Sequence, residues 1–206
     1  MKRLLLLSLL VCTGFYAQTN DSIIITELSQ KQTDTIKAQF SIYFNSFKNN
    51  DWEKAVDRLH PEFMKMMSRN DLLNQMKNAF EGDNFTTTFN SMEIKDVEKT
   101  FSYENVRYSI VIYKSSFTFH FTKSQDKTEE EFNEYLDDIT SVYTNQFLKQ
   151  VVTRNMSDIT IAGNKEILFI DDPKFETLKV LVYANELSMV YKEIFPEAVA
   201  NELSLE

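Results

Sequence analysis

The stretch that decides the fold is Tyr108–Phe121, whose sequence is YSIVIYKSSFTFHF. Its first half, up to Tyr113, is apolar at nearly every position, which is typical of a strand covered on both faces. Its second half alternates between phenylalanine and polar residues, which is typical of a strand covered on one face. Because an unbroken strand from Tyr103 to Thr122 would exceed the usual strand length, we expect a bulge or bend around Lys114–Ser116.

β-Forming residues also precede this stretch. From Phe85 to Ile94 the spacing of apolar residues approaches the period of two that a strand requires. We expect a turn near Lys99, so that the two segments form a β-hairpin.

Three helices are expected before the hairpin. Apolar residues recur at helical spacing from Ile36 to Phe47, and Asn49–Asp51 is suited to end this helix and cap the next. The second helix is short and runs from Trp52 to the end marked by His60 and Pro61. Ser68 and the acidic Asp71 then form an N-cap pattern for a third helix that continues to Gly82.

A fourth helix and a meander follow the hairpin. Thr128 and Glu131 fit a capping box, and apolar residues then keep helical spacing to Phe147. Three short strands are expected after it, followed by a last helix that begins near Pro196. The strands are Met156–Ile161, Glu166–Ile170 and Glu176–Ala184, divided by turns at 162–164 and 171–173.

The predicted fold class is α+β, with a curved antiparallel sheet of about five strands packed on helices in the order ααα-ββ-α-βββ-α. With few prolines and glycines and no internal repeat, residues 33–206 are expected to form a single domain. Residues 18–32 form a leader segment, in which Ile23–Ile25 either adds a short strand or stays loose.

The N-terminus has the pattern of a secretory signal peptide, residues 1–17. Lys2 and Arg3 precede an apolar run of about nine residues, well short of the roughly 20 that a membrane-spanning helix needs. We therefore expect an exported protein, periplasmic or secreted, with no integral membrane segment in the mature chain. The alternative, lipid attachment at Cys12, is disfavoured by Val11 before it. Cleavage after Ala17 would remove this sole cysteine.

Composition excludes several classes of chemistry. With 31 acidic and 22 basic side chains the net charge is −9, which repels phosphate backbones, so nucleic acid is not an expected partner. Three glycines leave no phosphate-binding loop, and two histidines with one cysteine leave no usual zinc site. We therefore expect no cofactor, no metal and no catalytic set.

The segment Asp51–Phe63, DWEKAVDRLHPEF, resembles the helix-to-loop passage of the nuclear-transport-factor-like (cystatin-like) α+β cone superfamily. The resemblance is best over Thr35–Phe80, and the members that the chain resembles are of the exported bacterial type. The helix between Thr128 and Gln150 and the tail after Asn185 depart from its simplest members. The resemblance implies a curved sheet wrapped around helices, with a pocket inside the cone. Because such folds serve as enzymes, transport factors and binding modules, it does not select a function.

Tyr108 and His120 are the candidate ligand-binding residues. His120 points opposite to the neighbouring phenylalanines and, if no bulge intervenes, to the same side as Tyr108. If that side faces the hollow of the cone, His120 could bind a ligand or act as an acid–base group. The alternative is a half-exposed histidine on a polar face. His60, before Pro61, is expected to complement the dipole at a helix end and cap its carbonyls.

Two functions remain open at this point. The first is a non-enzymatic exported module that binds a small molecule or a protein in or on the cone-shaped sheet, or forms a homodimer through a sheet face. It is favoured by the 13% aromatic content and by the missing catalytic sets. The alternative is a small cofactor-independent isomerase or hydrolase that uses a histidine in the pocket.

Overall fold

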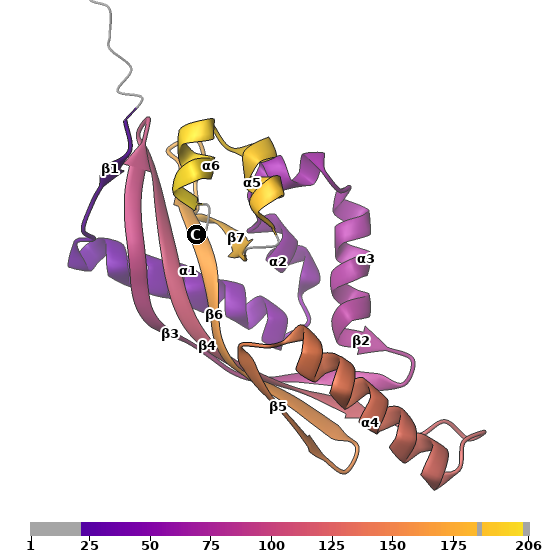
Figure 1. The fold of residues 1–206 in the computed structure, drawn as a ribbon. Helices are drawn as coiled ribbons and strands as arrows, with labels where there is room; N and C mark the ends of the chain where they lie inside the picture. Colours follow the sequence, from indigo (N-terminus) through magenta and orange to yellow (C-terminus); the bar gives the residue numbers. More distant parts are fainter. Residues whose placement is uncertain (1–21, 185–186, 204–206) are drawn as a thin grey trace, which may run out of the picture.

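The computed structural model describes residues 22–184 and 187–203, so the expected signal peptide and Cys12 lie outside the described residues. The chain is α+β, as predicted (Figure 1). Its elements are β1 (Ile24–Ile25), α1 (Gln30–Lys48), α2 (Trp52–Asp57), the 3-10 helix η1 (Pro61–Lys65), α3 (Arg69–Phe80), β2 (Glu81–Gly82), β3 (Phe85–Tyr103), β4 (Val106–Phe121), α4 (Glu129–Gln146), β5 (Gln150–Asn155), β6 (Asp158–Asp171), β7 (Lys179–Tyr183), α5 (Ser188–Ile194) and α6 (Glu197–Leu203).

The strands form one curled antiparallel sheet in the order β1-β3-β4-β6-β5. β2 pairs with β3, and β7 pairs with β6 beyond the end of β5. Five longer strands therefore make up most of the sheet, in the predicted order relative to the helices. β1 lies within Ile23–Ile25, where a short strand was one of the two alternatives. The differences are the two-residue strand β2 and a second helix at the C-terminal end.

The β3–β4 hairpin is present, but its turn lies at Glu104–Asn105 and not near Lys99. Both turn residues have positive φ angles, 46° and 69°, as expected for a tight hairpin turn that matches the twist of the strands. β4 also lacks a bulge around Lys114–Ser116, which was one of the two alternatives predicted there. β4 pairs with β6 without interruption, and the irregularities lie on β3 between Phe89 and Lys99. Extra residues there break the alternation of side chains and bend the strand, which helps the sheet to curl.

The meander has a different first turn from the one predicted. Residues 162–164, expected as a turn, lie in the middle of β6, and the chain instead turns at Met156, whose φ is 54°. Gly163 pairs with Gln150 of β5. The two residues lie so close that a Cβ on Gly163 would be 2.8 Å from the Gln150 Cγ and 3.0 Å from its Cα. The glycine thus permits close strand packing and does not end the strand.

Each face of the sheet carries its own apolar core. Odd-numbered residues of β4, such as Val111 and Phe119, point to the inner face and pack with α1, α2, α3 and α4. Even-numbered residues Tyr108 and Ile110 point to the outer face and pack beneath α5 and α6. The first half of β4 is therefore covered on both faces, as its sequence predicts.

Helix boundaries follow the expected capping chemistry. Thr128 and Glu131 form a capping box at the start of α4, and Ser68 caps α3 by accepting a hydrogen bond from the Asp71 backbone. Asp51 caps α2 in the same way through the Lys54 N–H. Each side-chain oxygen satisfies a backbone donor that has no partner within the helix.

His60 has a structural role, but it caps the start of a helix and not, as expected, the end of one. Its Nδ1 accepts a 3.4 Å hydrogen bond from the Glu62 backbone and so caps the start of η1, where a neutral ring is needed. The ring packs against Phe175 and Phe195. Burial lowers the pKa of His60, while the nearby Glu62 and Asp172 carboxylates oppose this shift.

The lowered pKa of His60 predicts a dependence of stability on pH. The stabilisation by neutral His60 is fully present above the ordinary histidine pKa of about 6.5 and is lost as the pH falls below it, because the unfolded chain binds the proton more readily. Between pH 7.5 and pH 5, we expect wild type to lose more thermal stability than His60→Asn, which keeps a capping acceptor but does not titrate. Thermal unfolding of both proteins across this range checks the prediction, and parallel curves would contradict it.

Candidate functional site

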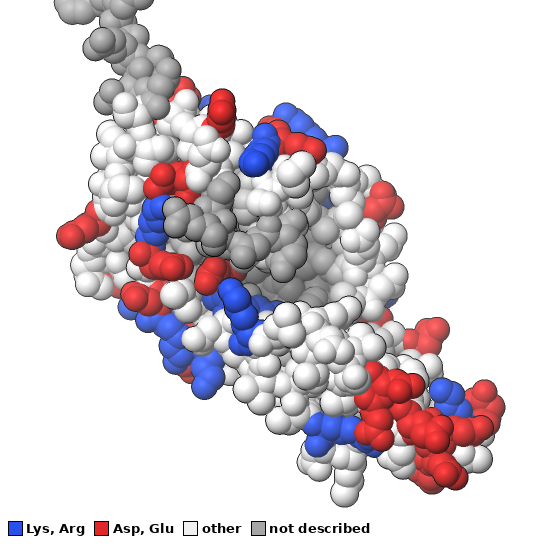
Figure 2. All heavy atoms as spheres, viewed as in Figure 1, with Lys and Arg blue, Asp and Glu red and all other residues white. Residues whose placement is uncertain are grey.

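The inner face of the curled sheet borders a cavity of about 710 Å³. This volume lies within the range of about 300–1,000 Å³ that small-molecule pockets occupy. Figure 2 shows basic side chains on the upper edge of the surface over α4 and β5, on the side toward α5. The cavity continues past β7 to Leu187 and Val190.

Aromatic rings form much of the wall of this cavity. Phe47 of α1 and Phe89 of β3 lie with centroids 5.5 Å apart, and Phe80 of α3 lies 4.9 Å from Phe89. Phe117 of β4 contacts Phe147, which follows α4, at 6.4 Å. Aliphatic side chains complete the wall, among them Leu72, Met76, Met92 and Ile167. An apolar molecule would find favourable contacts over most of this surface.

A short polar row crosses the floor of the cavity. Ser115 of β4 lies directly opposite Gly163 of β6, and Gly163 lies opposite Gln150 of β5. Among the described residues, the buried side-chain atoms without a hydrogen-bond partner are Thr26 Oγ1, Thr87 Oγ1, Ser115 Oγ and Gln150 Oε1. Two of these four therefore line this one cavity. Buried polar atoms without partners are rare and costly, so their presence together marks a place for a ligand or ordered water.

Lys165 lies next to this row, on the same face of β6. Its ammonium lies 5.2 Å from the centroid of Phe117 and 5.4 Å from that of Phe147. Burial lowers the pKa of Lys165. Within residues 22–184 and 187–203, no carboxylate forms an ion pair with this ammonium. The cavity thus contains a positive charge that the two rings stabilise only in part.

Two tyrosine hydroxyl groups add hydrogen-bonding capacity. Tyr43 of α1 and Tyr113 of β4 both line the cavity, and Tyr113 lies opposite Lys165 in the sheet. Burial raises the pKa of both tyrosines, and for Tyr43 the proximity of Tyr113 raises it further. Both hydroxyl groups therefore stay protonated at neutral pH and can donate a hydrogen bond.

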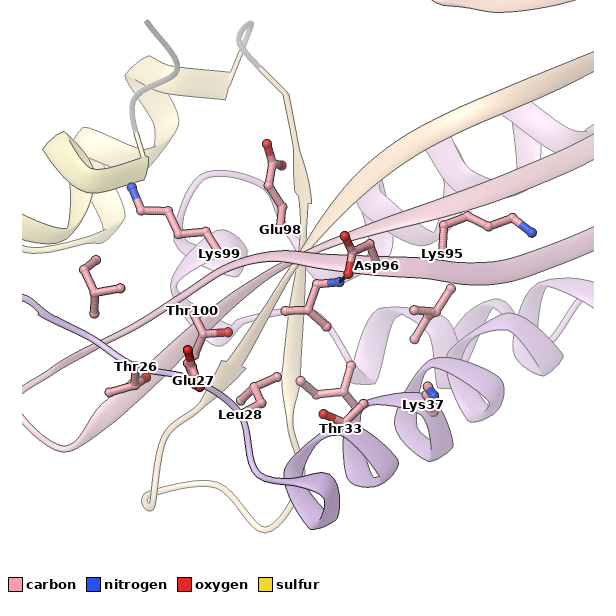
Figure 3. Close-up of a pocket in the computed structure, with 14 residues that line it drawn as sticks. Thr26, Glu27, Leu28, Thr33, Lys37, Lys95, Asp96, Glu98, Lys99 and Thr100 are labelled. Atoms are coloured by element: carbon pink, nitrogen blue, oxygen red, sulfur yellow. Dashed lines mark hydrogen bonds between the residues drawn. The ribbon is translucent and has the colours of Figure 1, made fainter.

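A smaller hollow of about 520 Å³ lies between the segment before α1 and β3 (Figure 3). Charged side chains line much of it, and two of them, Lys95 and Lys99, form ion pairs with Glu93 and Glu202. Because these cations already have partners, they offer less to a ligand than Lys165 does.

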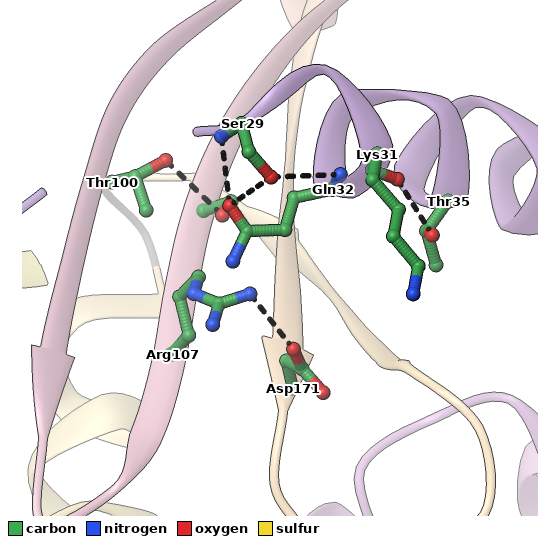
Figure 4. A network of polar contacts seen from close by, with 8 residues as sticks. Ser29, Lys31, Gln32, Thr35, Thr100, Arg107 and Asp171 are labelled. Carbon is green, nitrogen blue, oxygen red and sulfur yellow. Dashed lines mark hydrogen bonds and ion pairs between the residues drawn. The ribbon is translucent and has the colours of Figure 1, made fainter. Parts of the chain in front are cut away.

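Polar groups beside the smaller hollow are also paired with one another (Figure 4). Gln32 accepts hydrogen bonds from both the backbone and the side chain of Ser29, and Thr100 donates to Ser109 at 3.1 Å. These contacts fix the start of α1 and the end of the sheet. Thr26 Oγ1 is the buried exception. We therefore take the larger cavity as the candidate functional site.

Tyr108, one of the two residues predicted to bind a ligand, lies in the outer core. It is 5% exposed, stacks on Phe101 at 5.1 Å and meets Phe195 edge-on at 5.7 Å. Burial raises its pKa. It does not line either hollow.

His120, the other predicted residue, lies on the same outer face as Tyr108, because β4 contains no inserted residue. The two are twelve positions apart on one strand, about 40 Å, so the structure does not bring them together. Neither of them lines the cavity. Ligand binding by these two residues stays a prediction.

His120 lies between a carboxylate and a hydroxyl, as the catalytic histidine of many hydrolases does. Its Nδ1 lies 2.9 Å from Asp158 Oδ1, and its Nε2 lies 2.9 Å from Thr88 Oγ1. A hydroxyl, an imidazole and a carboxylate in this sequence resemble a nucleophile, a base and an orienting group. However, the histidine and aspartate side chains are each 42% exposed, and none of the three lines either hollow. Catalysis would also require a bound substrate and preorganised oxyanion donors.

Sequence reasoning missed Lys165, although a signal for it was present. Ile159, Ile161, Ile167 and Phe169 alternate on the inner face of β6, and the same parity places Gly163 and Lys165 on that face. Because a turn was predicted at residues 162–164, the alternation was not followed from Ile161 to Lys165. A lysine on the apolar side of a strand would otherwise have marked a site.

Comparisons with known proteins found no protein-family model, no curated protein and no solved structure that matches the chain. In the part of the chain that the structure describes, no group of three or more histidine, cysteine, aspartate or glutamate side chains could hold a metal ion. None of the described helices combines the length and the apolar character that crossing a bilayer requires.

Proposed function

We propose that the chain is an exported, non-enzymatic binding module that holds a small, largely apolar molecule in the cavity on the inner face of the sheet. The observation that supports this most is the 710 Å³ cavity itself, which is lined by aromatic and aliphatic side chains and contains buried polar atoms without partners. The signal-peptide pattern of residues 1–17 supports export.

Membership of the nuclear-transport-factor-like superfamily is part of this proposal. The curled antiparallel sheet is compatible with a cone, and Asp51–Phe63 supplies the resemblance in sequence. In that fold the inside of the cone is the usual place for a ligand, which agrees with the position of the cavity. Homodimer formation through a sheet face stays a separate prediction.

An enzymatic function has less support. The isomerase or hydrolase alternative requires a histidine in the cone, and neither His60 nor His120 lines the cavity. Lys165 and the two tyrosines could participate in proton transfer, but binding requires no further group, whereas catalysis would.

Binding of a neutral fluorescent probe tests the proposal. We expect N-phenyl-1-naphthylamine to bind wild type at one saturable site with increased emission, because the aromatic wall removes the probe from water. Met92→Trp, which places a larger ring in the cavity, is expected to weaken binding by about tenfold or more, since each 1.4 kcal/mol of lost contact is a factor of ten. Fluorescence titration measures both affinities.

The matched control is Met189→Trp. Met189 is 67% exposed and does not line the cavity, so this variant should bind the probe as wild type does. Circular dichroism establishes that each variant is folded, and Met76→Trp replaces Met92→Trp if the latter is not. Wild type that shows no saturable binding, or a cavity variant with unchanged affinity, would argue against a site in the cavity.

A further inference from the structure

The polar end of the large cavity has a defined composition. Lys165 supplies an ammonium and Ser115 a hydroxyl, with the carboxamide of Gln150 on the other side of Gly163, and Lys149 and Glu166 also line the cavity. Ser115 is only 3% exposed and its Oγ has no partner, and the same holds for the buried Gln150 Oε1. Because Gly163 has no side chain, Gln150 packs closely against it.

The charge at this end is not balanced within the fold. No described residue forms an ion pair with Lys165. Glu166 also lines the cavity, but the positive charge that acts on its carboxylate is that of Lys149. A partly buried cation without a counter-charge is costly, and contacts with two phenylalanine rings offset only part of that cost. An anion bound beside it would supply the missing charge.

From these contacts we infer that the ligand is a monocarboxylic acid with an apolar body, whose carboxylate accepts hydrogen bonds from Lys165 Nζ and Ser115 Oγ. This inference rests on the proposed function, since it names the ligand class of the same cavity. A single negative charge would balance the ammonium of Lys165, and a carboxylate offers acceptors to both donors. The Gln150 Nε2–H can donate to the same carboxylate, whereas Gln150 Oε1 is an acceptor and gains no partner from it.

The rest of the cavity determines the other end of the ligand. Away from Lys165 the wall consists of side chains such as Leu72, Met76, Phe80 and Phe89, which contact hydrocarbon favourably and offer it no hydrogen bonds. An acid with a polar body would lose its hydration there without compensation. Long-chain and aromatic monocarboxylic acids combine a charged head for the polar end with a hydrocarbon body for the apolar wall.

Displacement of the bound N-phenyl-1-naphthylamine by two matched ligands tests the inference. Dodecanoate and dodecan-1-ol share one chain and differ in the charged head group. We expect wild type to bind dodecanoate about 10- to 100-fold more tightly, because hydrogen bonds to charged groups contribute about 1.5–3 kcal/mol and 1.4 kcal/mol is a factor of ten. In Lys165→Met this preference should disappear, so that the ratio of the two affinities falls to about one whatever change in affinity the two ligands share.

The matched control is Lys114→Met. Lys114 is an exposed residue on the opposite face of β4, so this variant removes the same charge without touching the cavity and should keep the preference. Ser115→Ala is expected to lower the affinity for dodecanoate by a smaller factor, about two- to tenfold, as for a neutral hydrogen-bond donor.

Stability provides a second readout that does not depend on a ligand. Without ligand, Lys165→Met should unfold at a temperature about 2–4 °C above that of wild type, because it removes an uncompensated charge. A lower unfolding temperature would show that the lysine is structural and would overturn the inference.

The possible failures can be told apart. If the probe does not bind wild type, the proposed function fails. If the probe binds but dodecanoate and dodecan-1-ol compete equally, or if Lys165→Met keeps the preference for dodecanoate, the inference fails and the proposed function stands. Lys165→Gln serves in place of Lys165→Met if the latter does not fold, and the comparison of the two ligands on wild type requires no variant.

Discussion

Replacing Trp52 by alanine is expected to lower the free energy of unfolding by about 3–5 kcal/mol, the usual cost of removing a large buried aromatic side chain. Trp52 is 8% exposed and stacks on Phe80 with centroids 5.6 Å apart. It also meets Phe47 edge-on at 5.8 Å, so its loss would leave a cavity between α1, α2 and α3. Urea denaturation followed by circular dichroism measures the change.

Two controls separate the contributions of Trp52. Trp52→Phe keeps a ring but loses the indole N–H, which donates to Glu81 Oε1 at 3.1 Å, so it should cost less than the alanine variant. Leu148→Ala removes a side chain that is 83% exposed, and it should change stability by less than about 0.5 kcal/mol. A Trp52→Ala variant as stable as Leu148→Ala would show that the helices do not pack as described.

The helices could be predicted from sequence because their signals are local. Thr128 and Glu131 form their capping box within one turn of chain, and Ser68 satisfies a donor three residues away. Such contacts do not depend on the rest of the fold. The apolar stripe of each helix then indicates the face that must be buried.

The strand boundaries could not be predicted in the same way, because tertiary contacts decide them. Extra residues between Phe89 and Lys99 break the alternation of β3, so that a continuous strand resembles two strands with a turn between them. Gly163 resembles a turn residue until its partner Gln150 is known. Both errors come from features that depend on the neighbouring strand.

In the candidate site, too, some features depend on local sequence and others on tertiary contacts. The alternation along β6 could have placed Lys165 on the inner face, since this requires only the parity of one strand. That Ser115 has no partner could not be predicted, because it depends on what α1, α3 and the residues after α4 leave uncovered. Unbalanced charge and unpaired oxygen atoms lower stability, and a bound ligand that supplies their partners would stabilise the folded state.

The second large effect is expected at Tyr191, on the other side of the sheet. Tyr191 of α5 is 1% exposed and stacks on Tyr183 with ring centroids 6.1 Å apart. Its hydroxyl donates to the Val182 carbonyl at 2.8 Å and accepts from the Ala184 N–H at 3.0 Å. Tyr191→Ala should lower the free energy of unfolding by about 3–5 kcal/mol. Tyr191→Phe should cost about 1–3 kcal/mol, because it keeps the ring but leaves the Ala184 N–H without its acceptor.

Because the inner and outer cores share the strands β4 and β6, damage to one should destabilise both. Trp52 is the sole tryptophan and lies in the inner core, so its fluorescence reports on a different core from the one to which Tyr191 belongs. In a single cooperative domain, Tyr191→Ala should shift the fluorescence and circular dichroism transitions together. A fluorescence transition that stays at its wild-type position would instead mean that the outer core unfolds separately, which is incompatible with one domain over residues 33–206.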